Sequence, residues 1–304
     1  MKLLEKESSG LLDQPLSLHG GKLPDFMIIG AAKSGTTTLY DDLARHPGMC
    51  LPVFKEPDIL HRARSESEAR LMYSRHFAAA MPGQLCGEAS TYYTMLPTVP
   101  DVADLAKQSC GSRLKLIYIM RNPVARIRSH LAHDFAVGRL GHTDFDRAVR
   151  DDLHYLAWSD YPMQAKPWIE TFGLDQILFL SFETFVTDRS GTVAQVIRHL
   201  GLDPVEMEIG AGISNQRGSQ RQVCHPLVER LIGSEFYRYR LRPLLPGRLV
   251  KGGKALLTRR RAVPPVTFSP ETEERLTLAF ADQNSRLARL GVTVFPGAEP
   301  RQAG

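Results

Sequence analysis

The sequence predicts an α/β fold of P-loop-like, three-layer type, in which a central parallel sheet is flanked by helices on both faces. Three short apolar runs carry this prediction, at residues 26–29, 115–120 and 177–181. Each run has the length of a buried strand, and each is followed by a segment whose apolar residues have helical spacing. Strands that alternate with helices form parallel sheets covered on both faces.

The first helix is expected over Thr37–Arg45, because Leu39 and Leu43 lie four residues apart on one face and Pro47 prevents continuation. After the second strand, Asn122 is placed to cap a helix that has Pro123 at its first position.

After the third strand, a helix is expected over residues 190–200, ending at Gly201. A last amphipathic helix is expected over about 269–291, with Ser269 as its N-cap. Between these two helices, residues 237–268 contain many arginines and lysines, no acidic residue, and several prolines. We interpret this segment as an irregular basic lid or arm, which suits peripheral contact with an anionic membrane.

Length and composition predict one domain. The chain has 304 residues, of which 43% are hydrophobic and 23% charged. This composition is typical of globular proteins and excludes disordered, collagen-like and coiled-coil classes. We therefore expect a flexible leader over residues 1–22 and a single domain over residues 23–304.

Charge and cysteine content restrict the partners. The 38 basic and 33 acidic residues give a net charge of +5, which suits an anionic ligand but is too small to predict nucleic-acid binding. The four cysteines lie far apart without a CxxC pair, so we expect no structural metal and a reducing, cytoplasmic location. No apolar stretch reaches the length of a membrane span or of a signal-peptide core.

The loop after the first strand, residues 30–38, reads GAAKSGTTT. A loop of small residues that opens a helix offers free backbone N–H groups to a phosphate, and Lys33 adds a positive charge. The loop is not a Walker motif, since Lys33 precedes Gly35 by two residues instead of following a glycine directly. A βα turn with an incidental lysine is the alternative interpretation.

The string IIGAAKSGTTTLYDDLARHP resembles the 5′-phosphosulfate loop of sulfotransferases that use 3′-phosphoadenosine 5′-phosphosulfate (PAPS). The resemblance is closest to the carbohydrate, heparan-sulfate-like branch and to soluble bacterial-type members. It implies that Lys33 contacts the sulfonate and the bridging oxygen, and that no metal is required. The 5′-phosphate would be held by the residues that follow it, namely Ser34, Gly35, Thr36, Thr37 and Thr38.

A second anion site is predicted where the second strand ends. Arg121 can present its guanidinium to a phosphate, and Ser129 lies two helical turns further on, on nearly the same side. The segment is similar to the family's 3′-phosphate motif, R-[DN]-P-x-x-R-x-x-S. A later loop, with Arg217 and Gly218, resembles the segment that closes on the 3′-phosphate and adenine. The alternative is a solvated arginine-rich helix face.

The acceptor side needs a general base near Lys33. The pair Lys55-Glu56 resembles the K-E region of the carbohydrate branch, which makes Glu56 the expected base, with Lys55 beside it and His61 as the alternative. The segment around Ser90 resembles E-K-S-P-x-Y, although Ala89 stands where the glycan enzymes have lysine. Ser90 is therefore a candidate for substrate binding.

These residues predict transfer of a sulfuryl group from PAPS to a hydroxyl or amine, with adenosine 3′,5′-bisphosphate as product. The acceptor, whether a small molecule, a carbohydrate or a lipid-like compound, stays open. Two other classes remain as alternatives: a P-loop nucleotide kinase, or a non-catalytic anion-binding protein.

Overall fold

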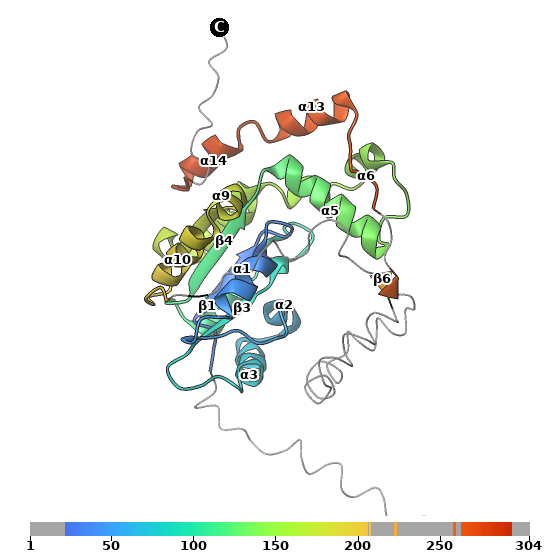
Figure 1. Ribbon diagram of the computed structural model, residues 1–304. Helices are drawn as coiled ribbons and strands as arrows, with labels where there is room; N and C mark the ends of the chain where they lie inside the picture. Colours follow the sequence, from blue (N-terminus) through green and yellow to red (C-terminus); the bar gives the residue numbers. More distant parts are fainter. Residues whose placement is uncertain (1–21, 206, 208–221, 224–257, 260–262, 294–304) are drawn as a thin grey trace, which may run out of the picture.

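The computed structural model describes residues 22–205, 207, 222–223, 258–259 and 263–293. Within them, five parallel strands form one sheet in the order β2-β3-β1-β4-β5. Figure 1 labels β1, β3 and β4 of this sheet. The strands are β1 (Phe26–Gly30), β2 (Met49–Cys50), β3 (Leu85–Ala89), β4 (Lys115–Met120) and β5 (Ile177–Ser181). The three predicted apolar runs are β1, β4 and β5, and the predicted fold class is confirmed.

The central strands divide their side chains between two cores, as the period of two in a strand requires. In β1, Phe26 and Ile28 enter one apolar cluster, whereas Met27 and Ile29 enter the other. All four side chains are at most 1% exposed. Both faces of β1 are therefore covered, which explains its continuous apolar sequence.

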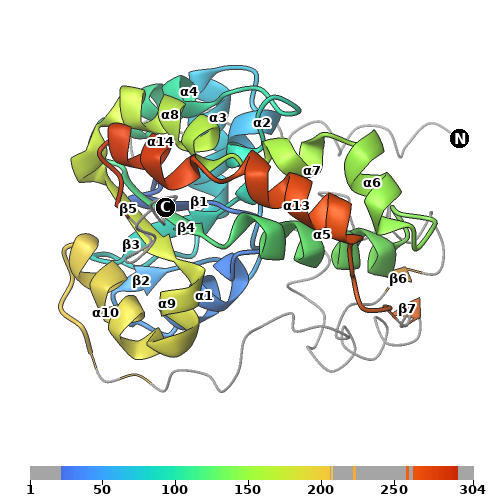
Figure 2. The ribbon, with the colours of Figure 1, turned by 90° about the horizontal axis from the view of Figure 1, so that it is seen from above.

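Helices cover both faces of the sheet, as Figure 2 shows from above. One face carries α1 (Thr36–Leu43), α9 (Phe182–Thr187) and α10 (Arg189–His199). The other carries α3 (Glu66–His76), α4 (Ala103–Cys110) and α8 (Tyr161–Phe172). Short segments complete these layers: α2 (Ile59–Arg62) and the 3₁₀ turns η1 (Thr91–Thr94) and η2 (Leu174–Gln176).

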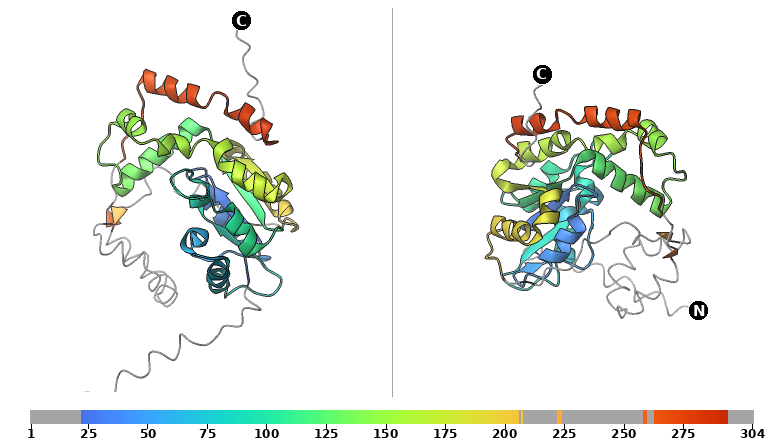
Figure 3. Two further views of the ribbon diagram at one scale, coloured as in Figure 1. Left: turned by 180° about the vertical axis from the view of Figure 1, so that it is seen from behind. Right: turned by 45° about the horizontal axis from the view of Figure 1, so that its top comes forward.

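A third apolar cluster lies beyond the sheet edge, around α5 (Pro123–Val137). It also contains residues of α6 (Phe145–Asp151), of the segment before α13 (Pro270–Ala279) and of α13 itself. The short helix α7 (His154–Ala157) follows α6, and α14 (Gln283–Arg289) packs on α8. Figure 3 shows α13 and α14 lying along the outside of the other helices.

Two ion pairs connect outer helices to the helices that cover the sheet. Arg189 at the start of α10 makes two 2.7 Å hydrogen bonds to the fully buried carboxylate of Asp42 on α1. Arg286 on α14 contacts both oxygens of Asp160, the N-cap of α8, at 2.9 and 3.0 Å. Such two-pronged contacts fix orientation as well as distance.

The predicted helix starts are confirmed. The Asn122 side chain accepts from the Ala125 N–H at 3.0 Å, and the Ser269 hydroxyl accepts from the Thr272 N–H at 3.3 Å. The expected helix over about 269–291 is corrected, because α13 ends at Ala279 and α14 begins at Gln283. Its helical period is interrupted at Phe280, whose backbone leaves the helical conformation.

Several expectations fall largely outside the described residues. These are the leader over 1–22, of which only residue 22 is described, and most of the basic arm over 237–268. Within the arm, β7 (Thr258–Arg259) pairs antiparallel with β6 (Gln222–Val223), and Val266 is buried in the third cluster. Among the described residues, no helix combines the length and the apolar character needed to cross a membrane.

Candidate anion-binding and transfer site

The loop between β1 and α1 opens at the carboxyl edge of the sheet. Gly35 occupies the N-cap of α1 with φ +87°, a left-handed conformation that glycine adopts without a Cβ clash. A Cβ at this position would also lie 3.0 Å from the ring of Phe182. The first intrahelical bond runs from the Leu39 N–H to the Gly35 carbonyl, so the amides before Leu39 have no intrahelical acceptor.

Burial decides which loop groups can reach a ligand. The side chains of Ser34, Thr36 and Thr38 are 0–4% exposed, so Thr36 and Thr38 would contact an anion through their backbone N–H groups. The Ser34 N–H already donates to the Ala31 carbonyl at 3.2 Å. Lys33, Gly35 and Thr37 are half-buried and border the surface. The loop predicted to bind phosphate is therefore a continuous turn, with Lys33 and Thr37 as its accessible polar side chains. Its contact with a phosphate stays a prediction.

Arg121 joins this loop to the end of β4. Its guanidinium donates a 3.2 Å hydrogen bond from Nη1 to the carbonyl oxygen of Lys33 and lies 4.5 Å over the Phe182 ring. Its backbone is held by Tyr161, whose hydroxyl donates to the Arg121 carbonyl at 2.7 Å. The two cationic residues that the sequence separates by 88 positions thus meet at one place.

The Lys33 ammonium lies in a partly desolvated, charged environment. Burial lowers the pKa of Lys33 to about 8, with Arg126 and Arg121 acting in the same direction. The carboxylates of Asp134 and Glu56 oppose this effect and favour the charged form. Lys33 is therefore a cation that loses its proton just above neutral pH.

Glu56 lies on the loop that follows β2, and its carboxylate contributes to the electrostatic environment of Lys33. Its backbone N–H donates to the Ala89 carbonyl of β3 at 2.9 Å, which fixes the loop against the sheet. The Lys55 ammonium pairs with Oε1 of Glu56, and the Thr91 hydroxyl donates to the same oxygen at 3.4 Å. The Glu56 side chain is 39% exposed, so a proton donor from solvent or a ligand can approach it.

His61 lies on α2, one turn beyond this loop. Its Nε2 donates to the Tyr92 carbonyl at 3.2 Å, which leaves Nδ1 as the acceptor, and burial lowers the pKa of the ring. In the electrostatic environment of Lys33 the carboxylates are Asp134 and Glu56. The choice between Glu56 and His61 as the base stays a prediction.

Ser90 is fully buried, and its hydroxyl has partners on two sides. It donates to Glu88 at 3.0 Å and accepts from the Asp58 N–H at 3.2 Å. Ser90 thereby fixes the turn that leads out of the Glu56 loop. Its predicted contact with substrate stays a prediction.

Glu88 was missed by the sequence reasoning, although it stands in the segment that resembles a family motif. Its buried carboxylate accepts hydrogen bonds from Tyr73 at 2.6 Å, Tyr93 at 2.9 Å and Ser90. Burial raises its pKa to about 7, against the opposing effect of these donors. A charged residue inside an otherwise apolar five-residue strand was the available signal.

Arg126 and Ser129, from the same predicted motif, differ in their surroundings. Arg126 is fully buried and donates to Ser159 at 2.7 Å and to the Tyr155 carbonyl at 3.1 Å. Its role here is structural. Ser129 is half-buried on α5, and its contact with a phosphate stays a prediction. Arg217 and Gly218 lie outside the described residues.

Three residues of the site have positive φ without being glycine. They are Lys33 at 70°, Glu56 at 60° and Asp58 at 51°. Non-glycine residues in this left-handed region cost conformational energy and are typical of functional sites. Two of the three, Lys33 and Glu56, are the predicted catalytic residues.

Several known proteins are similar to this chain in sequence. The family model described as "Sulfotransferase domain" matches residues 23–214. Mouse heparan sulfate glucosamine 3-O-sulfotransferase 3B1 is 30% identical over 191 residues, which are 60% of this chain and 47% of that protein. Human heparan sulfate glucosamine 3-O-sulfotransferase 6 is 29% identical over 201 residues, 63% of this chain and 56% of that protein. The chain thus spans about half the length of these relatives.

A solved structure supports the fold. The crystal structure of a sulfotransferase from Alicyclobacillus acidocaldarius superposes with a TM-score of 0.59 at 21% identity. The match covers 90% of this chain and 98% of that one.

The buried carboxyl of Glu88 should make the stability of the chain depend on pH. The folded chain keeps this proton up to about pH 7, whereas the unfolded chain releases it near 4.5. Between these values the contribution of Glu88 to the unfolding free energy falls as pH rises, by about 3 kcal/mol. Glu88→Gln should remove this slope, measured by urea unfolding at pH 5 and pH 7.5. Glu66→Gln, at an exposed position of α3, is the control. A Glu88→Gln slope equal to that of the parent chain would contradict the assignment.

Proposed function

The chain belongs to the PAPS-dependent sulfotransferase family, and on this premise we propose that it transfers a sulfuryl group from PAPS to a hydroxyl or amine. The observation that carries the proposal is the hydrogen bond from the Arg121 guanidinium to the Lys33 carbonyl at 3.2 Å. It supports one continuous binding site, because both cationic loops then face one region. A donor with a phosphate at each end of its ribose needs two such loops.

The donor would be held from both ends. The amides of residues 35–38 at the start of α1 would bind the 5′-phosphate, with Thr37 adding its hydroxyl. Arg121 and Ser129 would bind the 3′-phosphate, and Arg217 and Gly218 are predicted to complete that end. We propose that binding of the donor needs no metal, since the positive charge comes from side chains of the protein itself.

The transfer would be an in-line displacement at sulfur. The acceptor oxygen or nitrogen forms a bond to sulfur as the bond from sulfur to the 5′-phosphate oxygen breaks. Lys33 would neutralise the charge that develops on the sulfonate and leaving phosphate, a stabilisation that is largest in the transition state. Glu56 would take the acceptor proton, and adenosine 3′,5′-bisphosphate would leave.

The relatives suggest a class of acceptor. Their names describe sulfation of glucosamine in heparan sulfate, which supports a carbohydrate acceptor here. Ala89, which is fully buried, stands where the E-K-S-P-x-Y motif of the glycan enzymes has lysine. The acceptor side therefore has one positive charge fewer. Small-molecule and lipid-like acceptors therefore stay as alternatives. Membrane contact through the basic arm and a cytoplasmic location are separate proposals.

The first test is ligand binding. Adenosine 3′,5′-bisphosphate should raise the melting temperature in a concentration-dependent way, more than ATP with Mg²⁺ does. Transfer from ³⁵S-labelled PAPS to sugar, phenol and lipid acceptors should then be screened. Stronger stabilisation by ATP with Mg²⁺ would favour a kinase, and binding without any labelled product would favour an anion-binding protein.

Arg121→Ala should weaken the binding of adenosine 3′,5′-bisphosphate by about 10- to 100-fold, because a charge-assisted hydrogen bond is lost. Isothermal titration calorimetry measures the dissociation constant. Arg150→Ala, at an exposed position of α6, is the control. An unchanged dissociation constant would remove Arg121 from the donor site.

Lys33→Met should lower kcat by about 100- to 1,000-fold, since its charge acts mainly in the transition state. Methionine keeps the length of the side chain without the ammonium. The rate is measured with saturating labelled PAPS, and Lys166→Met on the exposed face of α8 is the control. A kcat within about threefold of the parent value would refute the catalytic role of Lys33.

Glu56→Gln should abolish transfer to a hydroxyl while leaving donor affinity unchanged, because an amide accepts no proton at neutral pH. Turnover and the dissociation constant for adenosine 3′,5′-bisphosphate are measured on the same preparation. Glu170→Gln on α8 is the control. If Glu56→Gln keeps its activity and His61→Asn loses it, the histidine is the base.

A further inference from the structure

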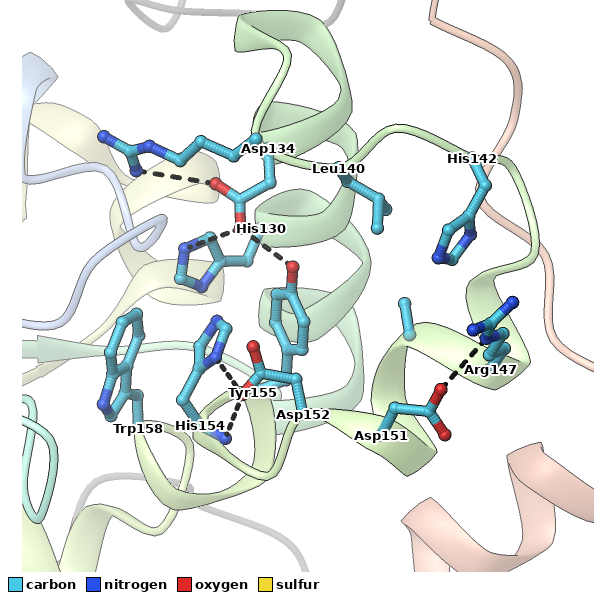
Figure 4. Close-up of a pocket in the computed structure, with 12 residues that line it drawn as sticks. His130, Asp134, Leu140, His142, Arg147, Asp151, Asp152, His154, Tyr155 and Trp158 are labelled. Carbon is cyan, nitrogen blue, oxygen red and sulfur yellow. Dashed lines mark hydrogen bonds and ion pairs between the residues drawn. The ribbon is translucent and has the colours of Figure 1, made fainter.

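The proposed function leaves unused a cavity of about 380 Å³ that is bordered by α5, α6 and α7 (Figure 4). Charged side chains on its wall pair with one another. Arg147 contacts Asp151 at 3.0 Å. Asp134 accepts from the Tyr155 hydroxyl at 2.9 Å, and Arg139 lies 3.6 Å from its other oxygen. Because these charges offset one another, they indicate no particular ligand.

The segment that carries Glu56 and α2 differs from this wall, because it is bound along its length to the 3₁₀ turn η1 and to the residue before that turn. Three hydrogen bonds of 3.2–3.3 Å join the two segments: from the Asp58 N–H to Ser90 Oγ, from the Leu60 N–H to Tyr93 Oη, and from His61 Nε2 to the Tyr92 carbonyl. The position of the Glu56 segment is therefore determined by η1.

The same turn is bound to β1, the strand that leads into the Lys33 loop. The buried Thr94 hydroxyl donates to the Ile29 carbonyl at 2.9 Å. A Cβ at Gly30 would lie 2.1 Å from Thr94 Oγ1, so glycine permits this close approach. The turn η1 thus contacts both segments that carry predicted catalytic residues, and it fixes one of them relative to the other.

Thr91, the first residue of η1, reaches the Glu56 carboxylate itself. Its hydroxyl is buried and donates to Oε1 of Glu56 at 3.4 Å. The Lys55 ammonium binds the same oxygen. Among the described residues, Oε2 of Glu56 has no hydrogen-bond partner, and the side chain is exposed. Two donors therefore hold one oxygen of the carboxylate, and the other oxygen is open.

We propose that Thr91 is a positioning residue for the transfer reaction, acting through Glu56. Thr91 and Lys55 hold Oε1, and Oε2 takes the proton as the acceptor atom bonds to sulfur. Holding the carboxylate in one orientation removes freedom that it would otherwise lose in the transition state. Thr91 stands where the E-K-S-P-x-Y motif has proline, which has no side-chain donor. The inference rests on the proposed function of Glu56 for its catalytic meaning.

The first test compares two substitutions of Thr91. Thr91→Val keeps the branched shape without the donor, and it should lower kcat by about 10-fold, the effect of one lost hydrogen bond to a charged group. Thr91→Ser keeps the hydroxyl and should retain kcat within about twofold. Both rates are measured with saturating labelled PAPS, and the dissociation constant for adenosine 3′,5′-bisphosphate should not change. Equal losses in Thr91→Ser and Thr91→Val would show a packing effect and overturn the proposal.

Thr171→Val is the matched control, because it makes the same chemical change away from the site. The Thr171 hydroxyl of α8 donates to the Asp104 carboxylate of α4 at 3.0 Å, at an exposed position. This variant should keep the parent kcat. A Thr91→Val chain that also kept the parent kcat would overturn the proposal.

Thermal unfolding tests the contact without any reaction. Thr91→Val should lower the melting temperature of the parent chain by about 2 °C. In the Glu56→Ala background the same change should cost less than about 0.5 °C, because the partner of the hydroxyl is already absent. Equal losses in the two backgrounds would overturn the proposal. If Thr91→Val does not fold, Thr91→Ala takes its place in each measurement.

Failure of the proposed function and failure of this inference give different results. If the chain is no sulfotransferase, the parent chain yields no labelled product, while the melting temperatures still report the contact between Thr91 and Glu56. If the inference alone is wrong, labelled product forms at the same rate in the parent chain and in Thr91→Val.

Discussion

The hydrogen bond between the Arg121 guanidinium and the Lys33 carbonyl is the contact on which the site depends. It exists because β1 and β4 are parallel neighbours, paired from Phe26 and Lys115 onward, so both strands end at the same edge of the sheet. Phe182, at the end of β5, supports it by packing against Gly35 and under the guanidinium. Three strand ends therefore build one candidate anion-binding surface at the carboxyl edge of the parallel sheet, where such folds bind ligands.

Gathering cations at this edge has an electrostatic cost that the fold must offset. Lys33, Arg121 and Arg126 repel one another, and burial increases the effect because water screens less of it. Carboxylates supplied by separate elements, Asp134 and Glu56, compensate from two directions. Such a balance keeps the folded chain stable while its site is empty. It also explains why the net charge of the chain, +5, says little about the local field.

The sequence predicted those features whose signals lie close together along the chain. The strands β1, β4 and β5 are apolar runs, and the cap at Asn122 lies next to its helix, so local patterns found them. β3 was missed because Gly87 and Glu88 interrupt its apolar pattern. Tertiary contacts explain both residues. The Phe26 ring would lie 2.1 Å from a Cβ at position 87, and Glu88 accepts hydrogen bonds from two tyrosines of other elements. The contact between Thr91 and Glu56 was missed because η1 and the Glu56 loop meet only in the folded chain.

The left-handed backbone at Lys33, Glu56 and Asp58 has a consequence for anyone who engineers this chain for heat resistance. Glycine at each of these positions would relieve about 1 kcal/mol of conformational energy, so a selection that rewards only survival of heating would enrich it there. The resulting proteins would be more stable and would have lost the Lys33 ammonium and the Glu56 carboxylate. Selection for robustness therefore has to be paired with selection for turnover.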